Sequence, residues 1–333
     1  MSRAHAESKV IAGLDEAGLG PLLGPLTVGY SAFRAPAGAR TLWELLSEVV
    51  APEPLQAGGR LVVADSKRVF ARNPRGARRL EMTALSFLAA APGGAPPDGP
   101  ALLSCAPPRA RPRADELARH PWYAHLPARL PAHVDAGRLE LCAGRLRREM
   151  LRARVELLGA GVRVVPAGEL NRSYRATGNK SLTVWEHVLG LLRHLWDAHG
   201  HEGVHVIVDR QGGRFHYARL LLRGFPSAGL SSVFESPAHS EYRLESKEPG
   251  GRTMRLTFAE GAERRAFSVA LASCLAKYAR EVCMDAFNRY FGALQPGLRP
   301  TAGYTTDGRR WMREAAPALE RARVSREVLV RER

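Results

Sequence analysis

The feature that most constrains this chain is the stretch over residues 9–30, KVIAGLDEAGLGPLLGPLTVGY. An apolar run typical of a buried strand ends in two adjacent carboxylates, Asp15 and Glu16. A glycine-rich turn follows, and residues 26–33 are again apolar, which predicts a second strand. Adjacent carboxylates at a strand end repel each other unless a cation lies between them, and hard cations such as Mg²⁺ prefer oxygen ligands. The stretch therefore favours a metal site; the alternative is an ordinary turn that Asp15 caps.

The run DEAGLGPLLGP, residues 15–25, closely resembles the DEAGRGPLAGP-type signature of ribonuclease HII, the type 2 ribonucleases H. That family cuts the RNA strand of RNA–DNA hybrids. The resemblance implies an α/β, ribonuclease H-like fold, in which helices flank a mixed central β-sheet, here with a helical C-terminal extension. It also implies two divalent cations, Mg²⁺ or Mn²⁺, as cofactors.

The overall composition agrees with a nucleic-acid partner. The chain has 333 residues, of which 45% are hydrophobic, so it can bury a core. Its 49 Lys and Arg against 33 Asp and Glu give a net charge of +16, and polyanions are the natural partners of such a surface. An arginine-rich genome would produce the same excess, so charge alone does not decide. The four cysteines form no CxxC pair, which argues against a zinc knuckle.

No apolar run in the sequence is long enough to cross a bilayer. Residues 1–9, MSRAHAESK, lack the apolar core of a signal peptide. We therefore expect a cytoplasmic protein without a membrane partner. We also expect it to act on nucleic acid as a monomer.

Two further acids complete a set that the resemblance implies. The segment VHVIVD, residues 204–209, predicts a central strand that ends in Asp209, and it resembles the family's LIDG strand, whose aspartate binds metal. Residues 268–280 resemble the family's ISAASILAKVTRD helix, and counting back from that helix places Glu263 at the fourth acidic position. The alternative for Glu263 is a favourable partner of a helix N-terminus. The implied catalytic and metal-binding residues are Asp15, Glu16, Asp209 and Glu263.

The glycine turn is the expected site of ribose recognition. The backbone at Gly18, Leu19 and Gly20 can approach a ribose, whose 2′-hydroxyl distinguishes RNA from DNA. The family has arginine where this chain has Leu19. Backbone recognition survives that change, whereas a side-chain contact with phosphate does not.

Other matches supply further substrate contacts. LVVADSKR, residues 61–68, resembles the family's NDSKKL element, which implies that Lys67 contacts a phosphate. The alternative is that Asp65 or Ser66 is simply the N-cap of a helix. GELNRSYRAT resembles DELNILHAT, and AGYTTDGRRW resembles KGYPT, whose tyrosine packs against a sugar. Arg210, which stands where the family often has glycine, either helps to hold substrate or weakens metal binding. The implied substrate-binding residues are Gly18, Leu19, Gly20, Lys67, Asn171, Arg210, Lys277 and Tyr304.

We expect one catalytic domain over residues 1–308 and a basic helical tail over 309–333. A Pro- and Arg-rich insertion at about 91–138 and a β-hairpin at about 231–258 interrupt the domain. Residues 101–105 suggest a short strand, and HPWY, residues 120–123, favours a docking patch over an aromatic anchor for nucleic acid. Apolar periodicity predicts helices over 41–50, 77–91, 139–158 and 183–199.

The expected function is an endonuclease that hydrolyses the RNA strand of RNA–DNA hybrids, or cuts at embedded ribonucleotides, with two metal ions. Two alternatives stay open. One is a nucleic-acid-binding relative with impaired catalysis, suggested by Leu19, Arg210 and Glu263. The other is a nuclease of the same fold that acts on a different nucleic acid, such as a DNA junction.

Overall fold

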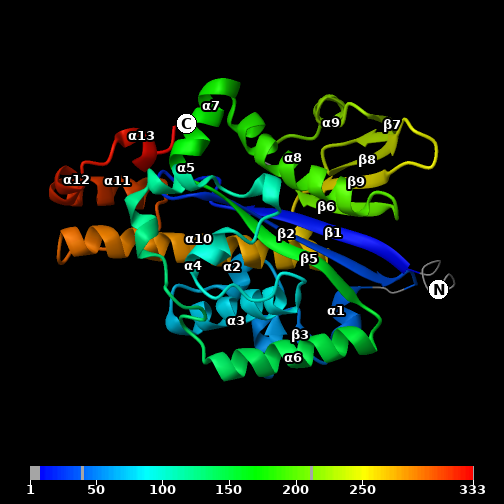
Figure 1. The fold of residues 1–333 in the computed structure, drawn as a ribbon, viewed down its shortest axis with the longest axis horizontal. Helices are drawn as coiled ribbons and strands as arrows, with labels where there is room; N and C mark the ends of the chain where they lie inside the picture. Colours follow the sequence, from blue (N-terminus) through cyan, green and yellow to red (C-terminus); the bar gives the residue numbers. More distant parts are fainter. Residues whose placement is uncertain (1–7, 39–40, 211–212, 333) are drawn as a thin grey trace.

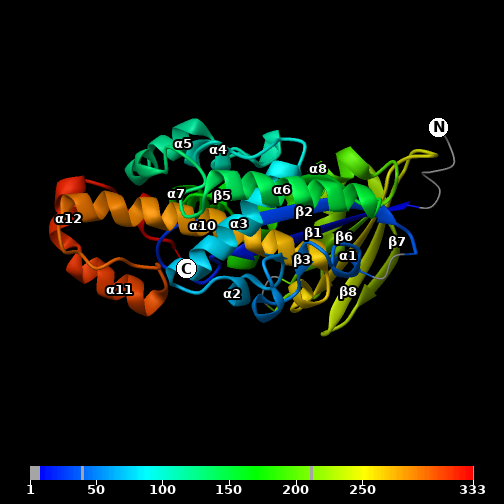
Figure 2. The same cartoon turned by 90° about the horizontal axis from the view of Figure 1, so that it is seen from below.

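The computed structural model describes residues 8–38, 41–210 and 213–332, and Figures 1 and 2 show it from two sides. The N-terminal residues 1–7, on which the signal-peptide argument rests, and Arg333 of the predicted tail lie outside this range. A seven-stranded sheet forms the centre, in the order β5 (Glu156–Val165), β2 (Leu26–Pro36), β1 (Ser8–Ala17), β6 (Val204–Asp209), β9 (Thr253–Ala259), β8 (His239–Ser246) and β7 (Ala228–Glu235). β6 runs parallel to both β1 and β9, and the other neighbours are antiparallel. The sheet is therefore mixed.

The helices are α1 (Leu42–Leu45), α2 (Ser66–Val69), α3 (Pro74–Ala90), α4 (Gly99–Leu103), α5 (Ala114–Ala118), α6 (Ala136–Arg152), α7 (Ala167–Thr177), α8 (Lys180–His199), α9 (Ala218–Gly224), α10 (Phe267–Leu294), α11 (Thr305–Glu314), α12 (Ala316–Ala322) and α13 (Arg326–Leu329). A small parallel pair, β3 (Val50–Ala51) and β4 (Leu61–Val62), lies apart from the main sheet. The expected α/β class, a mixed sheet flanked by helices with a helical C-terminal extension, is confirmed. None of the helices in the described ranges is long and apolar enough to cross a membrane.

The two faces of the sheet are covered by α8 and α10, one on each side (Figure 1). Alternate residues of β1, among them Leu14, share a core with Val188 and Leu192 of α8. On the other face α10 lies very close to the strands. A Cβ at Gly29 would run into the backbone of Ala272, so the glycine is what allows this close approach. Hydroxyl groups of β2 also donate to carbonyl oxygens of α10, including Ser31 Oγ to Ser268 O at 2.9 Å.

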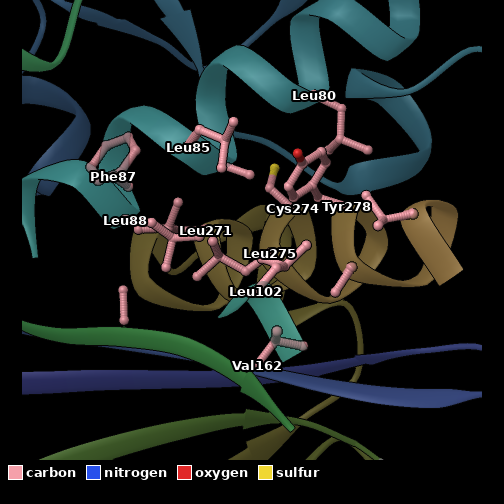
Figure 3. Close-up of a cluster of buried hydrophobic side chains, with 14 of the residues drawn as sticks. Leu80, Leu85, Phe87, Leu88, Leu102, Val162, Leu271, Cys274, Leu275 and Tyr278 are labelled. Carbon is pink, nitrogen blue, oxygen red and sulfur yellow. The ribbon is translucent and has the colours of Figure 1, made fainter. Parts of the chain in front are cut away.

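A second hydrophobic layer packs α3 against the outer face of α10 (Figure 3). Figure 3 labels Leu80, Leu85, Phe87 and Leu88 of α3, together with Leu271, Cys274, Leu275 and Tyr278 of α10, Leu102 of α4 and Val162 of β5. Full burial of a leucine side chain contributes about 2 kcal/mol. This layer therefore fixes α10 and, through it, the residues that α10 presents to the sheet.

The insertion is more ordered than its composition suggests. Residues 99–103 form the helix α4 rather than a strand, because the Asp98 side chain accepts from Ala101 N and caps the helix. The expected docking of the HPWY segment is confirmed: Trp122 is 2% exposed, and its ring lies 5.1 Å from that of Phe287 in α10. The apolar surface of α10 thus supplies a docking site that local composition does not reveal.

Four other elements differ from expectation in their bounds or in their place in the fold. α1 ends at Leu45, well before residue 50, because the chain turns there to form β3. α8 begins after Asn179, whose side chain accepts from Ser181 N and Leu182 N, and not at Thr183. The predicted hairpin forms, because β8 and β9 pair antiparallel, but it is part of the central sheet, since β9 also pairs with β6. α11 runs across the domain boundary expected at residue 308.

Candidate active site

The parallel pairing of β1 and β6 brings two of the predicted acids to one end of the sheet. Leu14 lies opposite Val208 in the register, so Asp15 and Asp209 are the next residues on neighbouring strands. Asp15 is 8% exposed, and Asp209 is half-buried. Glu16 follows directly, and its backbone N–H donates to Asp15 Oδ1 at 2.7 Å.

The fourth acid comes from the connection between β9 and α10. A single 3₁₀ turn, η4 (Ala262–Arg264), lies beside the end of β6, and Ala262 N donates to Asp209 Oδ1 at 2.9 Å. This bond places Glu263, which is 9% exposed, next to Asp209. Within the described ranges no hydrogen-bond partner is found for Glu263 Oε2, although this atom is buried. The structure therefore places acids from three separate segments of the sequence near one another: Asp15 with Glu16, Asp209, and Glu263.

The protonation behaviour of these acids reflects their crowding. Burial, with repulsion from Glu16 and Asp209, raises the pKa of Asp15 well above its usual range. Burial and the Asp209 charge raise the pKa of Glu16 to about 8, and burial and Glu263 raise that of Asp209 to about 6. Without a counter-charge, the cluster cannot be fully ionised near neutral pH.

The chemistry of this donor set fits hard divalent cations, which bind carboxylate oxygens. The unpartnered Oε2 of Glu263 and the raised pKa values of Asp15 and Glu16 describe crowded carboxylates that a bound cation would stabilise. In the part of the chain that the structure describes, no group of three or more His, Cys, Asp or Glu side chains is arranged so that it could hold a metal ion. A bound cation would therefore draw these carboxylates closer together than they lie here.

The glycine turn begins directly after β1. Gly18 has a φ of +88°, and a Cβ there would lie 2.6 Å from Arg280 Nε and 2.7 Å from Pro25 O, so only glycine fits. The backbone N–H groups of Leu22 and Leu23 donate to Gly303 O at 2.7 and 3.1 Å. The turn is thus connected to the segment that carries Tyr304.

A surface of aromatic and basic side chains lies near the turn. Lys277 Nζ is 4.7 Å from the centroid of the Phe70 ring, while Arg72 and Arg280 lie 6.0 and 5.5 Å from that of Tyr304. Tyr304 is 45% exposed, so its ring is accessible at the surface. Phe70 and Arg72 also line an adjacent cavity of about 520 Å³. We call Phe70, Arg72, Lys277 and Tyr304 the aromatic–basic surface, and Arg280 lies buried beneath it.

Lys67 stands at the start of α2, and both interpretations of its motif apply. The Asp65 side chain accepts from Lys67 N at 2.9 Å and caps the helix. The Lys67 side chain is exposed, and its charge lowers the pKa of Glu16, so it lies near the acids. A phosphate contact by Lys67 stays a prediction.

Asn171 and Arg210 are engaged elsewhere in the protein. Asn171 is 1% exposed, and its side chain is bonded to the backbone of the C-terminal segment, so a direct substrate contact would break those bonds. The Arg210 guanidinium donates to Glu260 Oε2 at 2.7 Å and to Pro237 O. In this structure, therefore, Arg210 ties the end of β6 to the edge of the sheet.

Two residues near the site were not predicted. A hydrogen bond between Ser273 and Asp15 counteracts the raised pKa of Asp15, and Ser273 Oγ lies 3.0 Å from Ser66 Oγ. Ser273 lies in the helix whose sequence matched, so the motif could have identified it. Arg331 reaches the glycine turn from the C-terminus, and no local pattern marks it.

No protein-family model and no curated protein sequence matches the chain. Among solved structures, the chain is similar to ribonuclease HII from Archaeoglobus fulgidus in its complex with PCNA, with 15% identity, 97% of this chain and 94% of that chain covered, and a TM-score of 0.41. It is also similar to ribonuclease H2 from Pyrococcus horikoshii, with 14% identity, coverage of 96% and 92%, and a TM-score of 0.40. A third similar structure is Bst-RNase HIII in complex with Mn²⁺, with 13% identity, coverage of 99% and 69%, and a TM-score of 0.37. Identities and scores this low do not assign the chain to a family.

Proposed function

We propose that this protein is an endonuclease that hydrolyses the RNA strand of RNA–DNA hybrids, or cuts DNA at embedded ribonucleotides. The observation that carries the proposal is the meeting of Asp15, Glu16, Asp209 and Glu263 at one end of the sheet. These residues would hold two divalent cations, Mg²⁺ or Mn²⁺. When bound, such a pair activates water and stabilises the leaving oxygen of a phosphodiester.

The protein's own contribution to this reaction is position and charge. Ala262 N holds one oxygen of Asp209, and Ser273 supports Asp15, so both carboxylates have fixed orientations. Lys67 adds positive charge beside Glu16, where a phosphate of the substrate would lie. The backbone of Gly18, Leu19 and Gly20 would meet the ribose.

The aromatic–basic surface supports a nucleic-acid substrate. Arginine and lysine beside aromatic rings can contact phosphates while the rings stack on sugars or bases. Tyr304 is half exposed there, next to the buried Arg280. The net charge of +16 makes binding weaken as salt rises.

One observation favours the alternative of nucleic-acid binding with impaired catalysis. Among the described residues no ready-made group of three metal ligands is present, and Glu263 carries one methylene more than the family's aspartate. This alternative predicts binding to hybrids without cleavage. It also predicts that Asp15→Asn leaves the protein's behaviour unchanged.

The deciding experiment is a cleavage assay with Mg²⁺ or Mn²⁺ on an RNA–DNA hybrid, on a DNA duplex with one ribonucleotide, and on branched DNA. The proposal expects cleavage of the hybrid or the ribonucleotide duplex and its loss in Asp15→Asn. Cleavage of branched DNA alone would favour a nuclease with another substrate. Binding without any cleavage would contradict the proposal.

A further inference from the structure

The C-terminal segment is docked firmly beside α7 (Figure 1). Val328, Leu329 and Val330 are buried. Asn171 of α7 donates to Glu327 O at 2.6 Å and to Val330 O at 2.8 Å, and its Oδ1 accepts from Glu332 N at 2.8 Å. One buried amide thus fixes the path of the chain just before and just after residue 331.

This docking brings the segment against the glycine turn. Val330 forms an antiparallel bridge with Leu23, and Arg331 N donates to Leu22 O at 2.9 Å. The Arg331 side chain, in a residue that is 4% exposed, donates to Gly18 O and, at 3.3 Å, to Leu19 O. A guanidinium from the end of the chain therefore holds two consecutive carbonyl groups of the turn.

Holding these carbonyls also sets the direction of the amides. In a planar trans peptide the C=O and the following N–H point in opposite directions. Because Gly18 O and Leu19 O both face Arg331, the N–H groups of Leu19 and Gly20 face away from it. The two donors of a guanidinium lie in a rigid fork, so one side chain can orient both peptides at once.

We infer that Arg331 is a positioning residue for ribose recognition: it holds the glycine turn so that backbone donors face the substrate. The inference rests on the proposed function. Burial keeps Arg331 itself from substrate phosphates, so its effect passes through the turn. Position 19 is leucine and supplies no side-chain hydrogen bond, so recognition there depends on the backbone and its support.

The test compares Arg331→Gln and Arg331→Lys with Arg326→Gln, an exposed arginine of the same segment. The full-length proteins bind a labelled DNA duplex with one ribonucleotide and the same duplex without it, with Ca²⁺ in place of Mg²⁺ to slow cleavage. We expect Arg331→Gln to reduce the preference for the ribonucleotide duplex about tenfold, since charged hydrogen bonds are lost. Lysine keeps the charge but not the fork, so Arg331→Lys should restore part of the preference. Arg326→Gln should leave the preference unchanged.

Amide hydrogen exchange over residues 18–22 gives a readout that does not depend on activity. We expect exchange to be about tenfold faster in Arg331→Gln, and unchanged in Arg326→Gln, if the guanidinium holds the turn. Unchanged exchange in Arg331→Gln, or an equal loss of binding to both duplexes, would overturn the inference. A wild-type protein that binds both duplexes equally but cleaves the ribonucleotide duplex with Mg²⁺ would contradict the ribose role of the turn and leave the proposed function intact, while loss of that cleavage would contradict the proposed function itself.

Discussion

Two regions of this protein bury carboxylates, and they treat them in opposite ways. Glu81 of α3 is fully buried and accepts from the backbone N–H groups of Ala132, His133 and Val134 and from Tyr278 Oη. At the ends of β1 and β6, the acids have other acids as neighbours, and burial with mutual repulsion raises the pKa of Asp15 and Glu16. The first arrangement satisfies a charge within the protein, and the second leaves negative charge to be satisfied by something else.

This difference separates a structural role from a functional one. A buried carboxylate surrounded by donors stabilises the fold, since it anchors a loop to the helix that carries it. Several carboxylates crowded together destabilise the fold unless a cation binds. Glu81 accordingly ties the insertion to α3, whereas the strand-end acids are suited to hold divalent ions.

The largest effect should come from removing one of the clustered acids. We expect Asp15→Asn to lower the rate of ribonucleotide-specific cleavage at least about a thousandfold, about 4 kcal/mol of transition-state stabilisation. The reason is that an amide is a poorer and uncharged ligand for a divalent ion. Single-turnover cleavage measures the change, and Asp197→Asn, on the exposed surface of α8, is the matched control. A loss below about tenfold would remove the distinction between the two regions.

Removing Glu81, the carboxylate with a structural role, should lower stability. We expect Glu81→Ala to reduce the free energy of unfolding by about 3 kcal/mol or more, because three backbone N–H groups lose their buried acceptor. Denaturant unfolding measures the loss, with Glu48→Ala at an exposed position as the control. If Glu81→Ala folds with nearly wild-type stability, the insertion does not depend on this anchor.

Divalent metal should stabilise the protein through one region alone. At a Mg²⁺ concentration of about one hundred times its Kd, we expect the free energy of unfolding to rise by about 2.7 kcal/mol relative to EDTA. The double variant Asp15→Asn, Asp209→Asn should lose this rise, while Glu81→Gln should keep it. Equal stabilisation of all three proteins would mean that Mg²⁺ binds elsewhere.

A buried histidine extends the comparison to a basic group. Burial and the Arg163 charge lower the pKa of His187 in α8 to about 3. The unfolded chain takes up a proton below about pH 6.5, whereas the folded protein does not, so stability is full above that pH and falls as pH decreases. Between pH 7 and 5 we expect His187 to account for a loss of about 2 kcal/mol. Denaturant unfolding measures this loss. The free energy of unfolding of His187→Gln should depend less on pH, whereas that of the control variant His201→Gln, at an exposed position, should follow the wild-type protein.

The sequence predicted the elements whose patterns are local. The apolar runs before Asp15 and Asp209, and the small residues along α10, identify β1, β6 and the helix beside them. The start of α8 was wrong, because Asn179 competes as the N-cap with Thr183. The strand predicted over residues 101–105 was also wrong, since a short run of apolar or small residues fits a strand or a helix equally well, and the structure has the helix α4 there.

The parts of the site that sequence could not supply depend on distant contacts. The order of motifs suggested that Asp15, Asp209 and Glu263 meet, because acids at the ends of neighbouring strands share an edge. Asn171 matched a motif, yet its amide is used by the C-terminal segment, about 160 residues away in sequence. Arg331 and Glu81 have no signal of their own, since their roles exist only once remote backbone groups lie beside them.

The central claim is that the strand-end acids hold divalent ions, and anomalous scattering from crystals soaked with Mn²⁺ tests it most directly. The account predicts Mn²⁺ peaks in contact with Asp15 and Asp209, with Glu16 and Glu263 drawn toward them, and no peak beside Glu81. Mn²⁺ peaks elsewhere, with the strand-end carboxylates still without ions, would contradict it.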